Sequence, residues 1–336
     1  MSELRQNIIT RDWVIIATER AKRPDQFAIK REKKIILPHY KPHCPFCLGN
    51  EEDIRLESFR ISDDHGWKVR VIPNKYPALS PVGERVRFTD NIHRALSGVG
   101  FHDVIIEHPR HDLTTALLSV EDIADILFAY RHRYSQIRQD PRIETVIIFK
   151  NHGDSAGTSL EHPHSQLAAT PVVPFQFRSR IDDAIRFFDD TGDCIFCRTI
   201  QDELTENKRI LLETEYFDAD IPYAALTPCQ TIHFPRGHTS SFHKITDFEI
   251  FDLAYMMKMI LSKLYYGLNN PDYNYTIRSS PIAEGETKYF HWYIAIVPRV
   301  TRQAGFELGS GMYINTALPE ESAEFLRTFQ LPLSHP

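Results

Sequence analysis

The sequence predicts an α+β fold made of two related halves, each an antiparallel sheet with helices packed on it. Two observations carry this prediction. A Cys-x-x-Cys pair followed by two separated histidines occurs twice, and the spacing of the histidines is 51 residues from His111 to His162 and 53 from His238 to His291. In both cases the first histidine is followed by a helical pattern and then by two β-rich segments. An internal duplication explains this repeat.

Composition places the chain among globular proteins. Of its 336 residues 42% are hydrophobic and 25% charged, with a formal charge of −6. The length suits two domains, which we place at residues 1–178 and 179–336. The mildly acidic balance without runs of like charge argues against nucleic acid or an anionic membrane as the main partner. We find neither a membrane-spanning stretch nor a secretory signal, so we expect a cytoplasmic protein.

A capped amphipathic helix is predicted in each half. Ser119 is suited to cap a helix whose apolar residues run from Ile123 to Tyr130. In the second half, Thr246 and Glu249 form a capping box around the start of an apolar run from Phe248 to Met259.

Two β-rich segments follow each helix. They cover residues 145–149 and 162–169 in the first half, and 273–277 and 290–297 in the second. The halves join near residues 174–190, and Asp189, Asp190, Gly192 and Asp193 supply turn chemistry just before the second Cys pair.

The repeated Cys and His residues predict two metal sites. Two thiolates and two imidazoles complete a tetrahedral zinc site, although the same ligands also accept iron. The predicted ligands are Cys44, Cys47, His111 and His162 for one site, and Cys194, Cys197, His238 and His291 for the other. Because all the ligands come from the protein, both metals would be structural. The alternative for either Cys pair is a redox dithiol or a buried pair.

The segment from His162 to Gln166 predicts the reactive centre. On a strand, His162, His164 and Gln166 project from one face. A metal at His162 would hold His164 beside it as a nucleophile toward phosphorus, and Gln166 could donate its amide N–H to a phosphoryl oxygen. The alternative is that His164 is a core histidine. In the second half Tyr293 replaces the nucleophile, so only the first half is expected to be catalytic.

These residues resemble the galactose-1-phosphate uridylyltransferase family, a branch of the histidine-triad superfamily. The matching motifs are CysProPheCys (44–47), ArgValIleProAsnLysTyrPro (70–77), the segment at His111, Asn151 and HisProHisSerGln (162–166). The resemblance implies two histidine-triad-like halves, a homodimer and a ping-pong reaction. In that reaction His164 attacks the α-phosphorus of a nucleoside-diphosphate sugar, and the nucleotidyl-histidine passes its nucleotide to a second sugar phosphate.

The resemblance also assigns substrate contacts. Asn74, Asn151, Ser159 and Gln166 look like nucleotide and phosphate contacts. Arg20 and Arg23 resemble basic residues that reach the neighbouring subunit's site, with ordinary surface charge as an equal alternative.

Three departures from the family pattern stand out. Ser165 replaces a usual glycine, and His291-Trp292-Tyr293 replaces the late His-x-His pair. Residues 304–315 lack the acidic residue that typical uridylyltransferases carry near Gly311, and this segment resembles plant-type relatives that phosphorolyse ADP-glucose.

Four functions are compatible with these residues. The leading hypothesis is a UDP-glucose:hexose-1-phosphate uridylyltransferase of galactose metabolism. The same chemistry on ADP-glucose, with phosphate or a sugar phosphate as acceptor, is its closest competitor. A histidine-triad-type nucleotide hydrolase and a zinc-scaffolded nucleotide-binding protein are the other two.

Overall fold

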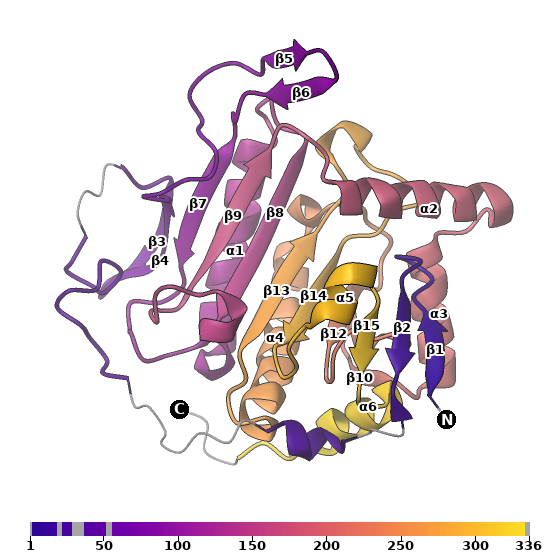
Figure 1. Ribbon diagram of the computed structural model, residues 1–336. Coiled ribbons are helices and arrows are strands. Elements are labelled where there is room, and N and C mark those ends of the chain that lie inside the picture. The colour runs from indigo at the N-terminus through magenta and orange to yellow at the C-terminus, as the bar shows by residue number, and fades with distance from the viewer. Residues whose placement is uncertain (1, 19–21, 29–36, 52–55, 333–336) are drawn as a thin grey trace.

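The computed structural model describes residues 2–18, 22–28, 37–51 and 56–332, and a ten-stranded sheet forms its centre (Figure 1). The first half of the chain contributes β3 (Phe59–Asp63), β4 (Gly66–Pro73), β7 (Phe101–Ile106), β8 (Thr145–His152) and β9 (His164–Thr170). The second half contributes β10 (Ile210–Glu213), β11 (Phe217–Asp220), β12 (Thr231–Pro235), β13 (Tyr273–Arg278) and β14 (Tyr293–Pro298). With the helices described below, this confirms the predicted α+β class.

The two halves share one sheet. Its strand order is β10-β11-β12-β14-β13-β8-β9-β7-β4-β3, and the paired neighbours whose register is given are antiparallel. Each half places an antiparallel hairpin at the outer edge, then a third strand, and sends a helix between that strand and the last two. This repeated order is what an internal duplication predicts. The halves meet where β13 pairs with β8, with Thr276 opposite Phe149.

Two long helices cover one face of the sheet. They are α1 (Val120–Ile137) and α4 (Asp247–Gly267), which lie behind the sheet in Figure 1. Ser119 accepts a hydrogen bond from the Asp122 backbone, and Thr246 with Glu249 forms the predicted capping box. Their buried residues pack with those of the sheet into a core that spans both halves.

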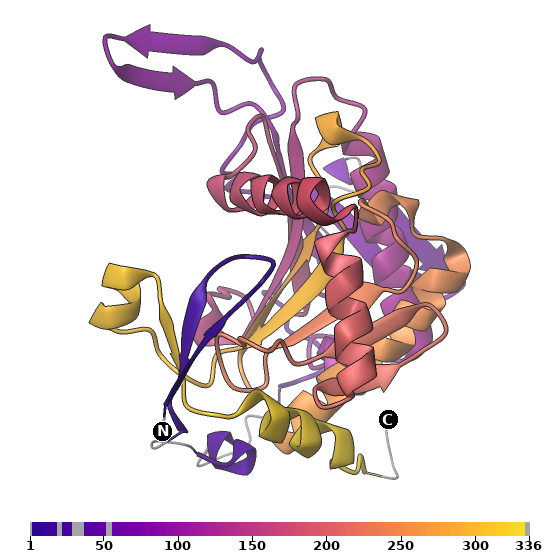
Figure 2. The same ribbon diagram turned by 90° about the vertical axis from the view of Figure 1, so that its right-hand side faces the viewer.

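The opposite face carries shorter elements. These are β1 (Glu3–Gln6), β2 (Trp13–Ile16), α2 (Phe175–Thr191), α3 (Ile195–Glu206), α5 (Gly305–Ser310) and β15 (Tyr313–Asn315), with α6 (Pro319–Thr328) at the lower edge in Figure 1. A hairpin of β5 (Arg87–Asp90) and β6 (His93–Leu96) extends from the body. Figure 2 shows this hairpin, α2 and α5 projecting from the same side. In the described part of the chain, every helix is too short or too polar to cross a bilayer.

The connection between the halves contains the helix α2, and the turn predicted just before the second Cys pair is present at Gly192, which caps this helix with φ 78°. One local expectation needs correction. The reactive strands begin later than predicted, β9 at His164 and β14 at Tyr293. His162 and His291 therefore lie just before their strands.

Candidate active site and metal clusters

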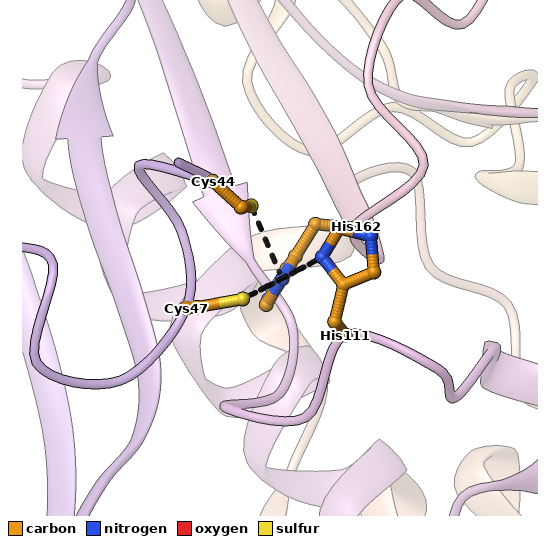
Figure 3. A group of neighbouring side chains, drawn as sticks. All are labelled: Cys44, Cys47, His111 and His162. Atoms are coloured by element: carbon orange, nitrogen blue, oxygen red, sulfur yellow. Dashed lines mark hydrogen bonds between the residues drawn. The ribbon is translucent and has the colours of Figure 1, made fainter. Parts of the chain in front are cut away.

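Cys44, Cys47, His111 and His162 meet in one buried cluster, as predicted (Figure 3). The Nδ1 atoms of the two histidines are 3.3 Å apart, and the sulfurs lie 3.5 to 3.7 Å from them. Tetrahedral zinc with Zn–N near 2.0 Å and Zn–S near 2.3 Å gives edges of about 3.3 and 3.6 Å. The donor set and its spacing therefore fit a tetrahedral ion.

Backbone groups next to this cluster orient its side chains. The Nε2 of His162 donates to the His108 carbonyl oxygen at 2.8 Å, which leaves Nδ1 facing the cysteines. The Lys41 backbone N–H points at the Cys47 sulfur at 3.3 Å. Both contacts favour metal binding through the atoms that converge in Figure 3.

The second cluster contains three of its four predicted ligands. Cys194, Cys197 and His238 converge, with 3.2 Å between the Cys197 sulfur and His238 Nδ1. His291 lies beside them, its ring 5.4 Å from the His238 ring, but its Nδ1 faces the Trp292 carbonyl oxygen at 3.1 Å. In this ring orientation His291 is not among the converging donors, and its role as fourth ligand stays a prediction.

His164 has the geometry of a nucleophile. Its Nδ1 donates to the carbonyl oxygen of His162 at 2.8 Å, which leaves Nε2 with the lone pair. The Phe46 ring packs edge-on against it at 5.6 Å, so the loop of the first Cys pair also holds the reactive ring. Burial lowers the pKa of His164, which keeps the imidazole neutral at pH 7.

A cleft of about 430 Å³ opens at His164. Its lining includes Asn151 and Ser159, two of the four side chains expected to contact substrate, but neither Asn74 nor Gln166. Residues 158–164 of the lining lead into the reactive strand. Gly153 and Gly157 have φ near +86° and +87°, so the loop between them takes a path that favours glycine. This loop is the Gly- and hydroxyl-rich segment expected to bind phosphate or sugar oxygens.

The second half of the chain fastens this loop, which the sequence did not reveal. Asp272 accepts hydrogen bonds from the backbone N–H and hydroxyl of Ser155, at 2.8 and 2.6 Å. Asn274 donates to the Asn151 side chain at 2.8 Å and to the Ala156 carbonyl at 2.9 Å. Asp272 directly precedes β13 and Asn274 lies in it, so the strand that joins the halves also holds this loop.

The remaining residues predicted to contact substrate lie at different distances from His164 along the fold. Gln166 lies on the same face of β9 as His164, two residues along. Asn74 follows β4, and its backbone N–H donates to the His102 carbonyl at 2.8 Å. Arg23 is exposed at the start of a short 3-10 helix and is not among the cleft residues. Arg20 lies outside the described residues.

Ser165 faces the opposite side of β9. Its hydroxyl accepts from Tyr130 at 2.5 Å, and Tyr130 also shares a hydrogen bond with Tyr275 at 2.6 Å. The residue that departs from the family pattern therefore joins α1 to β9 and β13 in the core, and it is not among the residues that line the cleft.

The chain is similar to known proteins in both sequence and structure. The family model described as galactose-1-phosphate uridyl transferase, N-terminal domain, matches residues 1–174. The ADP-glucose phosphorylase of Arabidopsis thaliana is 40% identical over 335 residues, covering 98% of this chain and 93% of that protein. The galactose-1-phosphate uridylyltransferase of Thermotoga maritima is 25% identical over 346 residues, covering 99% and 100%. A crystal structure of the Arabidopsis thaliana enzyme with bound ADP-glucose matches with a TM-score of 0.83 at 37% identity, covering 99% and 100%.

Proposed function

The chain belongs to the galactose-1-phosphate uridylyltransferase family of nucleotidyltransferases, and we propose that it transfers a nucleotidyl group from a nucleoside-diphosphate sugar through a covalent intermediate on His164. The observation that carries this proposal is the position of His164 at the cleft with its Nδ1 hydrogen-bonded to a backbone carbonyl, which leaves the lone pair on Nε2. The leading donor is UDP-glucose and the leading acceptor a hexose 1-phosphate, which places the enzyme in galactose metabolism.

The chemistry follows from this geometry in two displacements. The His164 Nε2 lone pair attacks the α-phosphorus, the bond from that phosphorus to the bridging oxygen breaks, and hexose 1-phosphate leaves. The Nδ1–H stays bonded to the His162 carbonyl, which stabilises the positive charge that develops on the ring. An oxygen of the acceptor phosphate then attacks the same phosphorus, and the P–N bond breaks. Gln166 donates its amide N–H to a phosphoryl oxygen in both steps.

The two Cys/His clusters are proposed as structural zinc sites. The donor set of the first cluster fits zinc in number, type and spacing. Bound there, zinc would supply folding energy and hold the Phe46 loop against His164. Iron is the alternative ion at either cluster.

A homodimer in the cytoplasm is proposed on two grounds. The family resemblance implies a dimer in which Arg20 and Arg23 reach the neighbouring subunit, and the exposure of Arg23 is compatible with that role. Unpaired cysteines arranged for metal binding suit a reducing compartment.

An adenylyl donor is the second candidate. The 40% identity to an ADP-glucose phosphorylase, against 25% to a galactose-1-phosphate uridylyltransferase, favours it. The mechanism and the nucleophile are the same with either donor, so the base and the acceptor are what an experiment must separate.

Intact-protein mass spectrometry after brief incubation with UDP-glucose or with ADP-glucose tests this proposal. We expect a UMP-sized adduct on the wild-type chain and none on the His164→Asn variant. An AMP-sized adduct would assign the adenylyl donor instead. An adduct that persists on His164→Asn would reject the nucleophile. No adduct with either sugar would favour the nucleotide hydrolase or the zinc-scaffolded binding protein.

A further inference from the structure

His102, on β7, has both ring nitrogens engaged. The backbone N–H of Ala78 points at Nδ1 from 3.0 Å, and the side-chain oxygen of Gln166 lies 2.8 Å from Nε2. His102 and Gln166 come from neighbouring strands, since β7 pairs with β9. The ring therefore connects the segment after β4 to the reactive strand.

The Ala78 contact determines where the ring proton lies. A backbone N–H can only donate, so Nδ1 must be the unprotonated nitrogen of a neutral ring. Nε2 then carries the proton and donates it to Gln166, which must present its amide oxygen to His102. The side-chain nitrogen of Asn74, 3.3 Å from the same Nε2, is consequently a neighbour and not its hydrogen-bond donor.

We propose that His102 is a positioning residue for nucleotidyl transfer, which holds Gln166 with its amide NH₂ turned toward the phosphoryl group beside His164. This inference rests on the proposed function. Without the His102 proton, the Gln166 amide can rotate by 180° and present its oxygen to a phosphoryl oxygen, and two acceptors repel each other. The amide NH₂ and the amide oxygen of Gln166 have nearly the same shape and differ mainly in whether they donate or accept a hydrogen bond. A donor such as His102 Nε2–H is therefore needed to fix which of them faces the phosphoryl group.

Two substitutions separate this role from a purely structural one. In His102→Asn, the short amide can place an oxygen near the position of Nδ1 and still accept from Ala78, but nothing reaches Gln166. In His102→Gln, the longer amide can place an N–H near the position of Nε2 and still donate to Gln166, while the Ala78 acceptor is lost. Each of the two substitutions therefore removes one of the two hydrogen bonds of His102 and keeps the other.

Single-turnover formation of the His164 adduct, with the donor sugar that labels the wild-type chain, is the readout. We expect His102→Asn to slow adduct formation about 10-fold to 100-fold, the usual cost of losing a group that orients a catalytic side chain. The donor concentration for half-maximal rate should change less than about twofold, because the effect arises in the transition state. We expect His102→Gln to keep most of the wild-type rate.

A double-mutant cycle completes the test. In a Gln166→Ala background, His102→Asn should cause little further loss, since its effect passes through Gln166. A wild-type rate for His102→Asn would overturn the inference, as would equal losses for the Asn and Gln variants or full additivity with Gln166→Ala. Absence of any adduct on the wild-type chain would instead reject the proposed function, and this inference with it.

Discussion

Glu107 and Lys150 form an ion pair directly beneath the reactive strand. Their side chains are 0% and 2% exposed. Lys150 also donates to the His164 carbonyl at 3.3 Å, and Thr115 donates to Glu107 at 3.1 Å. Burial lowers the pKa of Lys150, while the charge of Glu107 opposes that shift. The pair thus holds the backbone of His164, and Lys150 also lines the cleft.

Replacement of Glu107 by Ala should destabilise the protein by about 3–5 kcal/mol, because it leaves the Lys150 ammonium buried and unpaired. The free energy of unfolding from urea titration measures this. Asp202→Ala is the matched control, since its partner Arg198 lies 3.2 Å away on α3 and both side chains are more than half exposed. We expect the control to change stability by less than about 1 kcal/mol. Equal losses in the two variants would contradict the prediction.

Asp218 on β11 is a buried acid whose carboxylate has few stabilising contacts. Its side chain is 2% exposed, neither oxygen has a hydrogen-bond partner among the described residues, and Arg236 Nε is 3.7 Å away. Burial raises the pKa of Asp218 to about 6, with Arg236 opposing the shift. The folded protein therefore holds this proton more tightly than the unfolded chain, and stability falls as pH rises from about 4 to 6.

The Asp218→Asn variant should remove that loss. Above pH 6 we expect it to be more stable than the wild type by up to about 3 kcal/mol, and the difference should disappear near pH 4, where both side chains are uncharged. Melting temperatures of both proteins from pH 4 to 8 measure the difference. A difference that is the same at every pH would mean that the amide changes packing and not charge.

At the scale of elements, the two Cys pairs reach their clusters in different ways. Cys44 and Cys47 lie in a loop before the first strand of the sheet, whereas Cys194 caps the N-terminus of α3 and Cys197 lies in its first turn. Either metal would tie a peripheral element to the segment that leads into β9 or β14. A metal at the first cluster would also fix the loop that packs on His164.

Loss of a ligand should therefore cost both metal and stability. We expect Cys44→Ala to lower the zinc content by one ion per chain and to lower the melting temperature by several degrees, since about 2–4 °C corresponds to each kcal/mol in domains of this size. Metal analysis by mass spectrometry with a thermal melt measures both. Cys229→Ala, a buried cysteine outside the clusters, should leave the metal content unchanged. Unchanged metal in Cys44→Ala would reject the ligand assignment, and the same analysis of His291→Ala tests the fourth ligand of the second cluster.

At the scale of the molecule, large apolar side chains are exposed on the projecting elements. Ile92 is 88% exposed on the β5–β6 turn, Phe175 82% on α2, and Leu308 75% on α5. These elements project from one side of the molecule in Figure 2. These exposed side chains are candidates for contacts in the proposed homodimer.

Charged substitutions on this side should dissociate the proposed dimer. We expect Leu308→Asp to shift the sedimentation coefficient from that of a dimer toward that of a monomer, because an interface charge must be desolvated on association. Phe248→Asp is the control, because Phe248 is 78% exposed on α4, which covers the other face of the sheet. A monomeric wild type would reject the homodimer, and dissociation by Phe248→Asp alone would place the interface on the other face.

Much of this protein is determined by its sequence alone, through short-range signals. The caps at Ser119 and Thr246 lie next to the helices they start. The spacing of cysteines and histidines predicts the metal clusters without knowledge of the fold. Alternation along a strand likewise places His164 and Gln166 on one face and Ser165 on the other.

Only the tertiary structure decided which partners these residues find. The join of the halves into one sheet brings Asp272 and Asn274 to the loop around Ser155, and strand pairing brings His102 to Gln166. The apolar pattern of α4 could not show that Phe248 stays exposed. Such contacts join residues far apart in the chain, and their energy depends on register and burial, which are properties of the packed sheet and not of any local segment.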